Sequence, residues 1–475
     1  MGRSGTRFTQ AYTPSPFCAP ARACLASGME YEQTGVLINR PNNWNPDHTT
    51  IYKLLRDVGG YHTMTCGKDD LYYNDFRFPH YQNYKMRNLP DIDLGFSDAI
   101  RQDGKVRVMK DPPAHNKKQL NEPYRDFLNS QVVQMMNGTQ ISARDAYIAC
   151  MTGEGPEGGC DATSFPESIY PDDFVRDRAI DLLKRKPSDS KPFFMQVNFP
   201  GPHHPVVVTS SMARSVMDRL WPPPVNPQQV EFAPSGEAMT CQQQWKLSGK
   251  KHVRVDPAKM KLVHPQKEGR CNYGAEIEHI DRLMSSIVEQ LKATGEIANT
   301  VVVVAGDHGE NLGDNGTTGK GIPWQASVSV PLLISGPSVP RDQVHEGPVT
   351  TLDLGGTFLD LAGVKPTAFA RGMTTTSLLG PLRGHVSSGY DNWRLVVKEM
   401  PTSPDNDQLV TSYKLICCMN RACKGAPPST PKFQKPWQLL LYDVIGDPIH
   451  EVSLADSRPD VVEQLKVLLP DGYCR

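Results

Sequence analysis

Amphipathic helical stretches alternate with short β-branched runs along this chain, and no other feature limits its fold as strongly. Residues 275–294 carry apolar side chains at the spacing of one helix face, and the run that follows, 301–305, reads Val-Val-Val-Val-Ala. The runs at 62–66 and 192–199 also follow helical stretches, which are residues 50–56 and 174–186. Repetition of this unit is typical of a parallel sheet whose strands are buried on both faces. We therefore expect an α/β fold with a mainly parallel sheet flanked by helices.

Three polar clusters directly follow predicted strands. They are Gly67-Lys68-Asp69-Asp70, Gly201-Pro202-His203-His204-Pro205 and Gly306-Asp307-His308-Gly309-Glu310. In open α/β sheets, ligands bind beyond the carboxyl ends of the strands. We therefore predict that these clusters belong to an active site.

The pair Asp307-His308 has the residue types of a divalent-metal site. Oxygen-rich shells favour Ca²⁺ or Mg²⁺, whereas additional imidazole ligands favour transition metals. A loop aspartate that caps a turn, with an incidental histidine beside it, is an equally good interpretation of this segment alone.

The charge balance gives no support for a nucleic-acid or membrane-surface protein. The 475 residues include 51 Lys and Arg against 52 Asp and Glu. No apolar run approaches the roughly 18–20 residues of a membrane-spanning helix. Residues 1–7 are not followed by the apolar core of a signal peptide. We expect no nucleic-acid partner and no membrane span.

Eleven cysteines in a chain of this length do not form a dense disulfide framework. Those in loop-like segments are Cys150 and Cys160 and, near the C-terminus, Cys417, Cys418 and Cys423. Disulfides within these groups and reduced surface thiols are both open. Asn137 and Asn315 fit the N-glycosylation triplet. The cellular compartment stays undecided.

Two stretches, 102–160 and 209–270, resemble insertions between the helical and β-branched units. The second holds a basic run, Lys246, Lys250, Lys251, His252, Arg254, Lys259 and Lys261. A solvated loop and a rim that attracts anionic substrates are the two interpretations of this run.

The pattern changes after residue 382. Short alternating runs at 393–397, 413–416 and 438–443 predict antiparallel strands, and residues 459–469 predict a final helix. We therefore expect a domain at 1–382 and a small α+β subdomain at 383–475.

The segment 18–28 reads Cys-Ala-Pro-Ala-Arg-Ala-Cys-Leu-Ala-Ser-Gly. A cysteine in this Cys-x-Pro-x-Arg pattern, Cys18, is either a structural residue in a Pro-bounded turn or a catalytic one. The segment resembles the signature of the sulfatase family, in which the cysteine is oxidised to formylglycine. A hydrated aldehyde gives an oxygen nucleophile with a second hydroxyl that can later expel the attached group.

Further blocks resemble the same family, in the same order along the chain. They are residues 7–12, Gly67-Lys68, the Pro-His-His-Pro run at 202–205, the segment 307–332, the predicted helix at 352–363, and Leu441-Tyr442-Asp443 with the residues up to 455. The resemblance therefore runs from residue 7 to residue 455 and implies an alkaline-phosphatase-like sheet.

The resemblance also implies site residues. It implies that Cys18 becomes formylglycine, that Arg22 orients it, and that Asp307 and His308 are ligands, together with residue 18, of a metal ion. Lys68 and Lys320 match the lysines that hold sulfate oxygens, and His203 matches the histidine near the leaving oxygen. Two alternatives stay open: Arg22 only pairs with a carboxylate, or His204 takes the place of His203. The implied metal is Ca²⁺, with Mg²⁺ as the alternative.

Three features depart from the family pattern. Ala21 replaces the usual serine, and Asp70 stands where many members have histidine, which either weakens general-base catalysis or marks a divergent subgroup. The resemblance also implies a buried strand ending in two metal-binding aspartates before residues 7–12, and Met1 begins the sequence too late to include it. Losing such a strand can remove as much stability as the ~5–15 kcal/mol that a domain has in total. We therefore expect a shortened or fragmentary form of a genuine sulfatase.

The resemblance implies hydrolysis of sulfate esters, with a sulfated small molecule or glycan as substrate and the formylglycine-generating enzyme as a partner. It implies a secretory, lysosomal or extracellular location in eukaryotes. Two other functions stay open: hydrolysis of phosphonates or phosphodiesters on the same sheet, and a catalytically silent binding protein.

Overall fold

The computed structural model describes residues 2–39, 44–45, 47–71, 93–102, 104–109, 122–134, 138–152, 166–187, 191–225, 239–241, 243, 254–255, 262–263, 269–365, 372–403, 406–419, 437–448 and 452–474. The chain divides into two compact units. The first comprises Met1–Tyr61, Asp70–Gly95 and Ile297–Arg475, and the second comprises His62–Asp69 and Phe96–Glu296.

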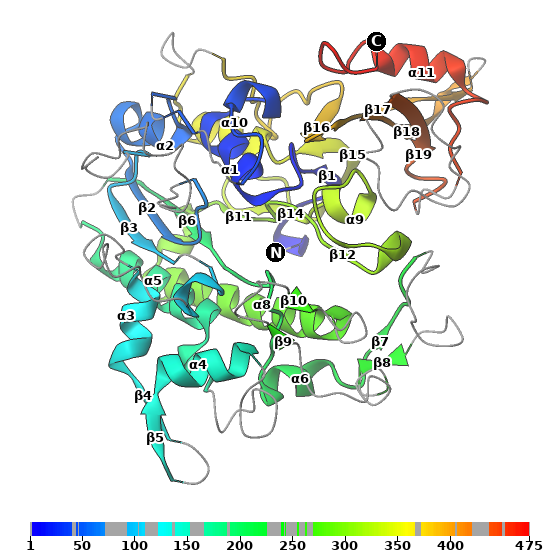
Figure 1. Ribbon diagram of the computed structural model, residues 1–475. Coiled ribbons are helices and arrows are strands. Elements are labelled where there is room, and N and C mark those ends of the chain that lie inside the picture. Colours follow the sequence, from blue (N-terminus) through cyan, green and yellow to red (C-terminus); the bar gives the residue numbers. More distant parts are fainter. Residues whose placement is uncertain are drawn as a thin grey trace. The chain divides into compact units, whose positions relative to one another are not determined.

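The first unit contains a four-stranded sheet in the order β11-β14-β1-β15 (Figure 1). Its strands are β1 (Gly5–Tyr12), β11 (Val302–Ala305), β14 (Leu332–Ser335) and β15 (Gln343–Thr350). β1 is parallel to β15 and antiparallel to β14, and β14 is also antiparallel to β11. The sheet is therefore mixed, and β14 is the strand that reverses direction.

Four α-helices of the first unit are α1 (Cys18–Ser27), α2 (Ile51–Lys53), α9 (Gln325–Val328) and α10 (Asp353–Leu361). α2 continues as a π-helical turn over Leu54–Val58 that ends at Gly59, so the helix predicted over 50–56 is confirmed. A two-stranded ribbon follows β11 and consists of β12 (Asn311–Leu312) and β13 (Thr318–Gly319). Apolar side chains of β1, β14 and α10, including Phe8, Ile334 and Leu354, share one core.

A second sheet of the first unit is wholly antiparallel, as predicted. Its strands are β16 (Val386–Tyr390), β17 (Trp393–Ser403), β18 (Asn406–Met419) and β19 (Trp437–Asp443). Successive side chains of a strand point to opposite faces. Val396, Leu415 and Leu441 on one face pack with the final helix, α11 (Pro459–Lys466), which runs along this sheet in Figure 1.

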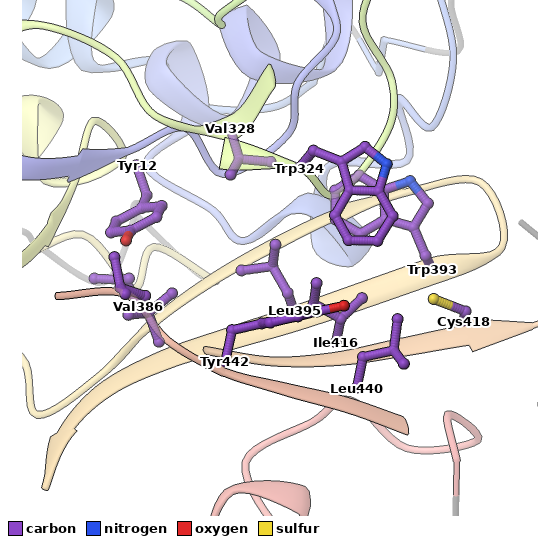
Figure 2. Packing of buried hydrophobic residues seen from close by; sticks show 12 residues of the cluster. Tyr12, Trp324, Val328, Val386, Trp393, Leu395, Ile416, Cys418, Leu440 and Tyr442 are labelled. Atoms are coloured by element: carbon purple, nitrogen blue, oxygen red, sulfur yellow. The ribbon is translucent and has the colours of Figure 1, made fainter. Parts of the chain in front are cut away.

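The opposite face of this sheet packs against residues at the end of β1 and at the start of α9. Figure 2 shows Leu395, Ile416 and Tyr442 of the sheet facing Tyr12 and Trp324. Tyr12 and Trp324 are 0% and 1% exposed. The C-terminal sheet is therefore part of the same compact unit as Cys18, and one core joins the two.

The second unit contains a parallel sheet in the order β3-β2-β6. Its strands are β2 (His62–Gly67), β3 (Asp98–Arg101) and β6 (Phe193–Asn198). Its helices are α3 (Pro123–Ser130), α4 (Ala143–Thr152), α5 (Pro171–Arg185), α6 (Ser210–Val216) and the 25-residue α8 (Gly269–Ala293). Its short ribbons pair β4 (Val132–Gln134) with β5 (Gln140–Ser142), β7 (Leu220–Trp221) with β8 (Met239–Thr240), and β9 (Arg254–Val255) with β10 (Leu262–Val263).

Two of the predicted strands are less buried than expected. Every residue of β6 is only half-buried, and β11 has the same burial except for the exposed Ala305. The prediction of strands buried on both faces is wrong for these two. Within the described residues each is the edge strand of its sheet, so one side of its backbone lacks a neighbouring strand.

The described cysteines of the two predicted groups are disulfide-bonded and not reduced, but pairing within the group is wrong for Cys417. Cys417 of β18 pairs with Cys474, and Cys241 pairs with Cys271. Cys150 and Cys418 are disulfide-bonded as well. Cys417 and Cys418 are buried in a strand, not placed in a loop, and Cys160 and Cys423 lie outside the described residues.

Several features predicted from the sequence lie partly or wholly outside the described residues. Asn137 and the side chains of the basic run from Lys246 to Lys261 lie outside the described residues. Asn315 lies in a turn with a positive φ of 51°. No helix in the part of the chain that the structure describes is both long and apolar enough to cross a membrane.

Candidate active site

Cys18 is the first residue of α1, and the chain changes conformation at this point. Phe17 before it is extended, with φ −148° and ψ 143°. The amide of Ala21 then donates to the carbonyl of Phe17 at 2.9 Å, which closes the first helical turn. The predicted Pro-bounded turn is therefore the N-terminus of a helix, with Pro20 in the first turn, where a missing N–H is tolerated. The Cys18 side chain is buried.

The imidazole of His308 lies against the sulfur of Cys18. Nε2 of His308 is 3.2 Å from Sγ of Cys18, and Nδ1 is 2.9 Å from the carbonyl oxygen of Gly309. A carbonyl only accepts hydrogen bonds, so Nδ1 carries the hydrogen. In the neutral ring, Nε2 is then the basic nitrogen and points toward residue 18, the arrangement that a metal-binding histidine needs.

Gly309 is required by the way this loop packs. A Cβ atom on Gly309 would lie 2.1 Å from the carbonyl oxygen of Ala326. The loop after β11 therefore approaches the N-terminus of α9 as closely as backbone atoms permit. This contact fixes the backbone that orients Asp307 and His308.

Asp307 follows β11 and uses both carboxylate oxygens. Oδ2 accepts from Nε and Nη2 of Arg22 at 3.1 and 2.8 Å, and Oδ1 accepts from the amide of His308 at 3.0 Å. The hydroxyl of Thr13 donates to the backbone carbonyl of Asp307 at 2.6 Å. The chain after β1 and the chain after β11 are thus tied together at this residue.

Arg22 has two carboxylates beside it. Besides Asp307, Oδ2 of Asp70 lies 3.8 Å from Nε of Arg22. Burial alone would lower the pKa of Arg22, but the charges of Asp307 and Asp70 outweigh it, and the pKa is raised well above its usual range. Asp70 therefore serves as a second counter-ion of Arg22.

Opposing effects act on the protonation of His308. Burial lowers its pKa and the nearby charge of Lys320 lowers it too, while Asp307 raises it, and the net shift is upward. Asp307 Oδ2 is 3.7 Å from His308 Nε2. The carboxylate of Asp307 therefore favours positive charge at His308.

Three side chains present metal-binding atoms to one point. The ligand atoms of Cys18, Asp307 and His308 lie within 4.8 Å of one another, and no other such group occurs in the described residues. A carboxylate and an imidazole with its other nitrogen already bonded fit a divalent cation. Ca²⁺ takes six to eight oxygen ligands, so these three residues would supply only part of the coordination shell of such an ion.

Lys320 lies close to this group on the loop after β13. Its Nζ is 5.9 Å from the centre of the Phe17 ring, and Phe17 stacks on Tyr390 with 4.7 Å between ring centres. The next residue, Gly321, donates to the carbonyl of Pro16 at 3.1 Å and accepts from the indole of Trp393 at 2.9 Å. The loop that carries Lys320 is thus bonded to the segment before Cys18 and to β17.

Sequence reasoning missed the contribution of the C-terminal sheet to this site. Burial, with the charge of Asp391, raises the pKa of Tyr390 to about 12, so its hydroxyl stays protonated beside Phe17. The adjacency of Phe17 to Cys18 was a signal that an aromatic residue borders the site. The sequence holds no comparable signal for Tyr390 or Trp393, which lie more than 60 residues after Lys320.

The remaining predicted residues lie in the second unit. Lys68 directly follows β2, and its amide donates to the carbonyl of Asn198 at 3.1 Å. His203 lies after β6, and its Nδ1 is 2.8 Å from the carbonyl oxygen of His204. The predicted positions at strand ends are confirmed for both residues. The structure brings together Cys18, Arg22, Asp307, His308 and Lys320 in the first unit, and it describes Lys68 and His203 separately from them.

A family model for sulfatases matches residues 1–364. This chain belongs to the sulfatase family. The match covers β1, the Cys18 helix, the Asp307-His308 loop and Lys320.

Curated sulfatases align with most of the chain at low identity. An arylsulfatase of Clostridium perfringens is 25% identical over 389 residues, which are 80% of this chain and 72% of the relative. A human N-acetylglucosamine-6-sulfatase is 24% identical over 398 residues, or 81% of this chain and 60% of the relative. Sulfatase relatives of this kind support a hydrolase of sulfuric esters.

Solved structures of sulfatases and related hydrolases share the fold. A phosphonate monoester hydrolase of Agrobacterium radiobacter has a TM-score of 0.62 at 17% identity, covering 98% of this chain and 89% of its own. A protein solved with its substrate D-glucosamine-2-N,6-O-disulfate has a TM-score of 0.61 at 17% identity, with 98% and 90% covered. The predicted alkaline-phosphatase-like fold of the sulfatase family is thus confirmed.

Proposed function

We propose that this chain hydrolyses sulfate esters and that residue 18, oxidised from cysteine to formylglycine, is the position of the nucleophile. The observation that carries the proposal is the contact of Cys18 with His308, with Asp307 and Arg22 directly behind them. A buried cysteine alone would be a structural residue. A buried cysteine beside a carboxylate, an oriented imidazole and a guanidinium has charged groups around it that can stabilise the charges formed in a reaction.

Asp307 and His308 are the residues that would hold a divalent cation, with Ca²⁺ proposed and Mg²⁺ as the alternative. A bound cation would supply Lewis-acid polarisation and lower the pKa of an oxygen nucleophile. Arg22 binds Asp307 through two nitrogens and so fixes the carboxylate in one orientation. The hydrogen bond from Nδ1 of His308 to the carbonyl of Gly309 fixes the orientation of the imidazole ring in the same way.

Cationic side chains suit an anionic sulfuryl group. We assign Lys320 and Lys68 to the sulfate oxygens, where fixed positive charge stabilises the charge that develops in the transition state. His203 would donate a proton to the leaving oxygen. Its Nδ1 already contacts the carbonyl of His204, so Nε2 is the nitrogen proposed to face the substrate.

A sulfated sugar is the proposed substrate class. One relative is named for N-acetylglucosamine 6-sulfate, and one structural neighbour was solved with a disulfated glucosamine. The formylglycine-generating enzyme is the proposed partner that modifies residue 18. We assign the reaction to residues 1–382 and propose 383–475 as the C-terminal α+β subdomain.

Phosphonate ester hydrolysis is the second candidate, favoured by the fold shared with the phosphonate monoester hydrolase. Both substrates would present a singly charged anion to the same lysines. The two functions are separated by comparing kcat/KM for 4-nitrophenyl sulfate and for a 4-nitrophenyl phosphonate monoester.

The test uses protein produced in a host that contains the modifying enzyme, with Ca²⁺ present. Wild-type protein should release 4-nitrophenol and sulfate from 4-nitrophenyl sulfate, and Cys18→Ala should lose at least about 10³-fold in kcat, as removal of a nucleophile does. Cys24→Ala is the matched control, since Cys24 is buried in the same helix and should retain activity. Equal activity in wild type and Cys18→Ala would contradict the proposal, and preference for the phosphonate would select the second candidate.

A further inference from the structure

The segment 201–207, which carries His203, is bonded through its backbone to buried side chains of the second unit. Each bond joins a side chain from another element to a main-chain atom of the segment. The bonds run between Asp172 and the amide of Gly201 (2.9 Å), Lys105 and the carbonyl of Pro205 (3.3 Å), Asn272 and the carbonyl of Val206 (3.0 Å), and Tyr170 and the carbonyl of Val207.

These side chains include a buried ion pair. Lys105 and Glu276 of α8 contact each other, and both side chains are 0% exposed. Asp172 of α5 is fully buried as well. Burying charges without water is unfavourable unless they are paired and hydrogen-bonded. Such a buried charged group either serves only the stability of the fold or positions a neighbouring segment.

The carboxylates are pressed against the first residue of the segment. A Cβ atom at Gly201 would lie 2.4 Å from Oε1 of Glu276 and 2.9 Å from Oδ2 of Asp172. Among the residues that the structure describes, no donor bonds to Oδ2 of Asp172 or to Oε2 of Glu276. The described hydrogen bonds of these two carboxylates go to Lys105, to Tyr170 and to the amide of Gly201.

A second buried pair on the same two helices has no such contact. His279 of α8 and Asp173 of α5 are 2.5 Å apart, with side chains 3% and 7% exposed. Their other described bonds go to Arg282 and Arg176, on their own helices. This pair resembles the first in being buried and in including a residue of α8, and it lacks described bonds to 201–207.

We propose that Asp172, Lys105 and Glu276 are positioning residues that hold the backbone of 201–207 and thereby place His203 for the reaction. The assignment of a role to His203 rests on the proposed function. The hydrogen bonds that hold the backbone of 201–207 do not depend on that proposal, so an experiment can reject the role of His203 without rejecting the positioning of the segment.

Hydrogen exchange of the peptide covering 201–207 tests the backbone part without any substrate. Asp172→Ala removes the acceptor of the Gly201 amide, and exchange in this segment should become about tenfold faster or more, because local opening no longer breaks that bond. Asp172→Asn keeps an oxygen at the same place and should restore most of the protection. Asp173→Ala should leave exchange in 201–207 within about twofold of wild type, while lowering the melting temperature.

Kinetics of the same variants test the link to His203. Asp172→Ala and Lys105→Met should lower kcat by about 10–10²-fold with a smaller change in KM, as misplacement of a reacting group does, and Asp173→Ala should not.

Equal effects of Asp172→Ala and Asp173→Ala on exchange and on kcat would reduce the cluster to a structural role and overturn the inference. If Asp172→Ala does not fold, Lys105→Met and Asp172→Asn carry the same comparison. If the wild-type protein shows no sulfatase activity while Asp172→Ala still exchanges faster than wild type in 201–207, the proposed function is rejected and the bonding of the segment stands.

Discussion

The Nε2 atom of His308 lies 3.2 Å from the sulfur of Cys18 because the carbonyl of Gly309 occupies the other ring nitrogen. The two residues are 290 positions apart in the sequence and meet because β1 leads to one and β11 to the other. The predictions below follow from how this contact and its surroundings are held.

Arg22→Lys should impair the site although the charge is retained. Two nitrogens of Arg22 reach Oδ2 of Asp307, and a lysine ammonium cannot reproduce this planar fork. We expect kcat/KM to fall by about 10²-fold, since Asp307 loses its fixed orientation. Steady-state kinetics with 4-nitrophenyl sulfate measure this. Arg458→Lys is the control, because Arg458, directly before α11, also binds a carboxylate, that of Asp460, through two nitrogens. A fall in activity of both variants would show an effect of stability alone.

Gly309→Ala should displace the loop that carries Asp307 and His308. The added Cβ would overlap the carbonyl of Ala326, so the loop that orients His308 must move. We expect loss of Ca²⁺ binding, measured by isothermal titration, together with loss of activity. Gly363→Ala serves as a control for a glycine with open space around it, although its φ of 66° makes that change mildly strained as well. Retained Ca²⁺ affinity in Gly309→Ala would show that the loop geometry is not needed.

Trp393→Phe should weaken the attachment of the loop that carries Lys320 to the C-terminal sheet. The ring remains but the indole donor to Gly321 is lost, which should cost about 1 kcal/mol of the free energy of unfolding. We also expect KM for the sulfate ester to rise more than kcat falls, because Lys320 is assigned to the sulfate. Chemical denaturation and kinetics give the two numbers. An unchanged KM would remove Trp393 from the support of the site.

Stability should depend on pH through Glu276. Burial, against the opposing effect of Lys105, raises the pKa of Glu276 above its usual value of 4.5. In the pH range between the pKa of the unfolded chain and the pKa in the folded protein, the folded protein binds more protons than the unfolded chain, so the free energy of unfolding falls as the pH rises through this window. Urea unfolding across the window measures the slope. Glu276→Gln should flatten it, and a slope equal to that of wild type would assign the pH dependence to other groups.

Breaking the disulfide between Cys417 and Cys474 should destabilise the C-terminal sheet. The bond closes a loop of 57 residues, for which the loss of chain entropy in the unfolded state corresponds to about 4 kcal/mol. The double variant Cys417→Ser with Cys474→Ser should therefore melt at a markedly lower temperature. An unchanged melting temperature would mean that the C-terminal segment is held by the packing of α11 alone.

The parts of the fold that the sequence predicted are those that depend on local pattern. The helix over residues 275–294 and the strand over 301–305 were predicted because helical spacing and a β-branched run are both visible within a short window. Burial of β6 and β11 was mispredicted because burial depends on neighbouring strands, which a run of valines does not specify.

The site shows the same division. The positions of Asp307, His308 and Lys68 at strand ends follow from the α/β pattern. The stacking of Tyr390 on Phe17 and the bond from Trp393 to Gly321 arise from packing between segments far apart in the chain. The buried group of Lys105 and Glu276 was equally hidden, because one member lies in a stretch that resembled an insertion.

The most direct test of the account is the mass of the tryptic peptide that contains residue 18, from protein purified from its native host. The account predicts a mass about 18 Da below that of the cysteine form, the change expected when the thiol becomes the aldehyde of the proposed nucleophile. An unmodified thiol at residue 18 in protein that hydrolyses sulfate esters would contradict it.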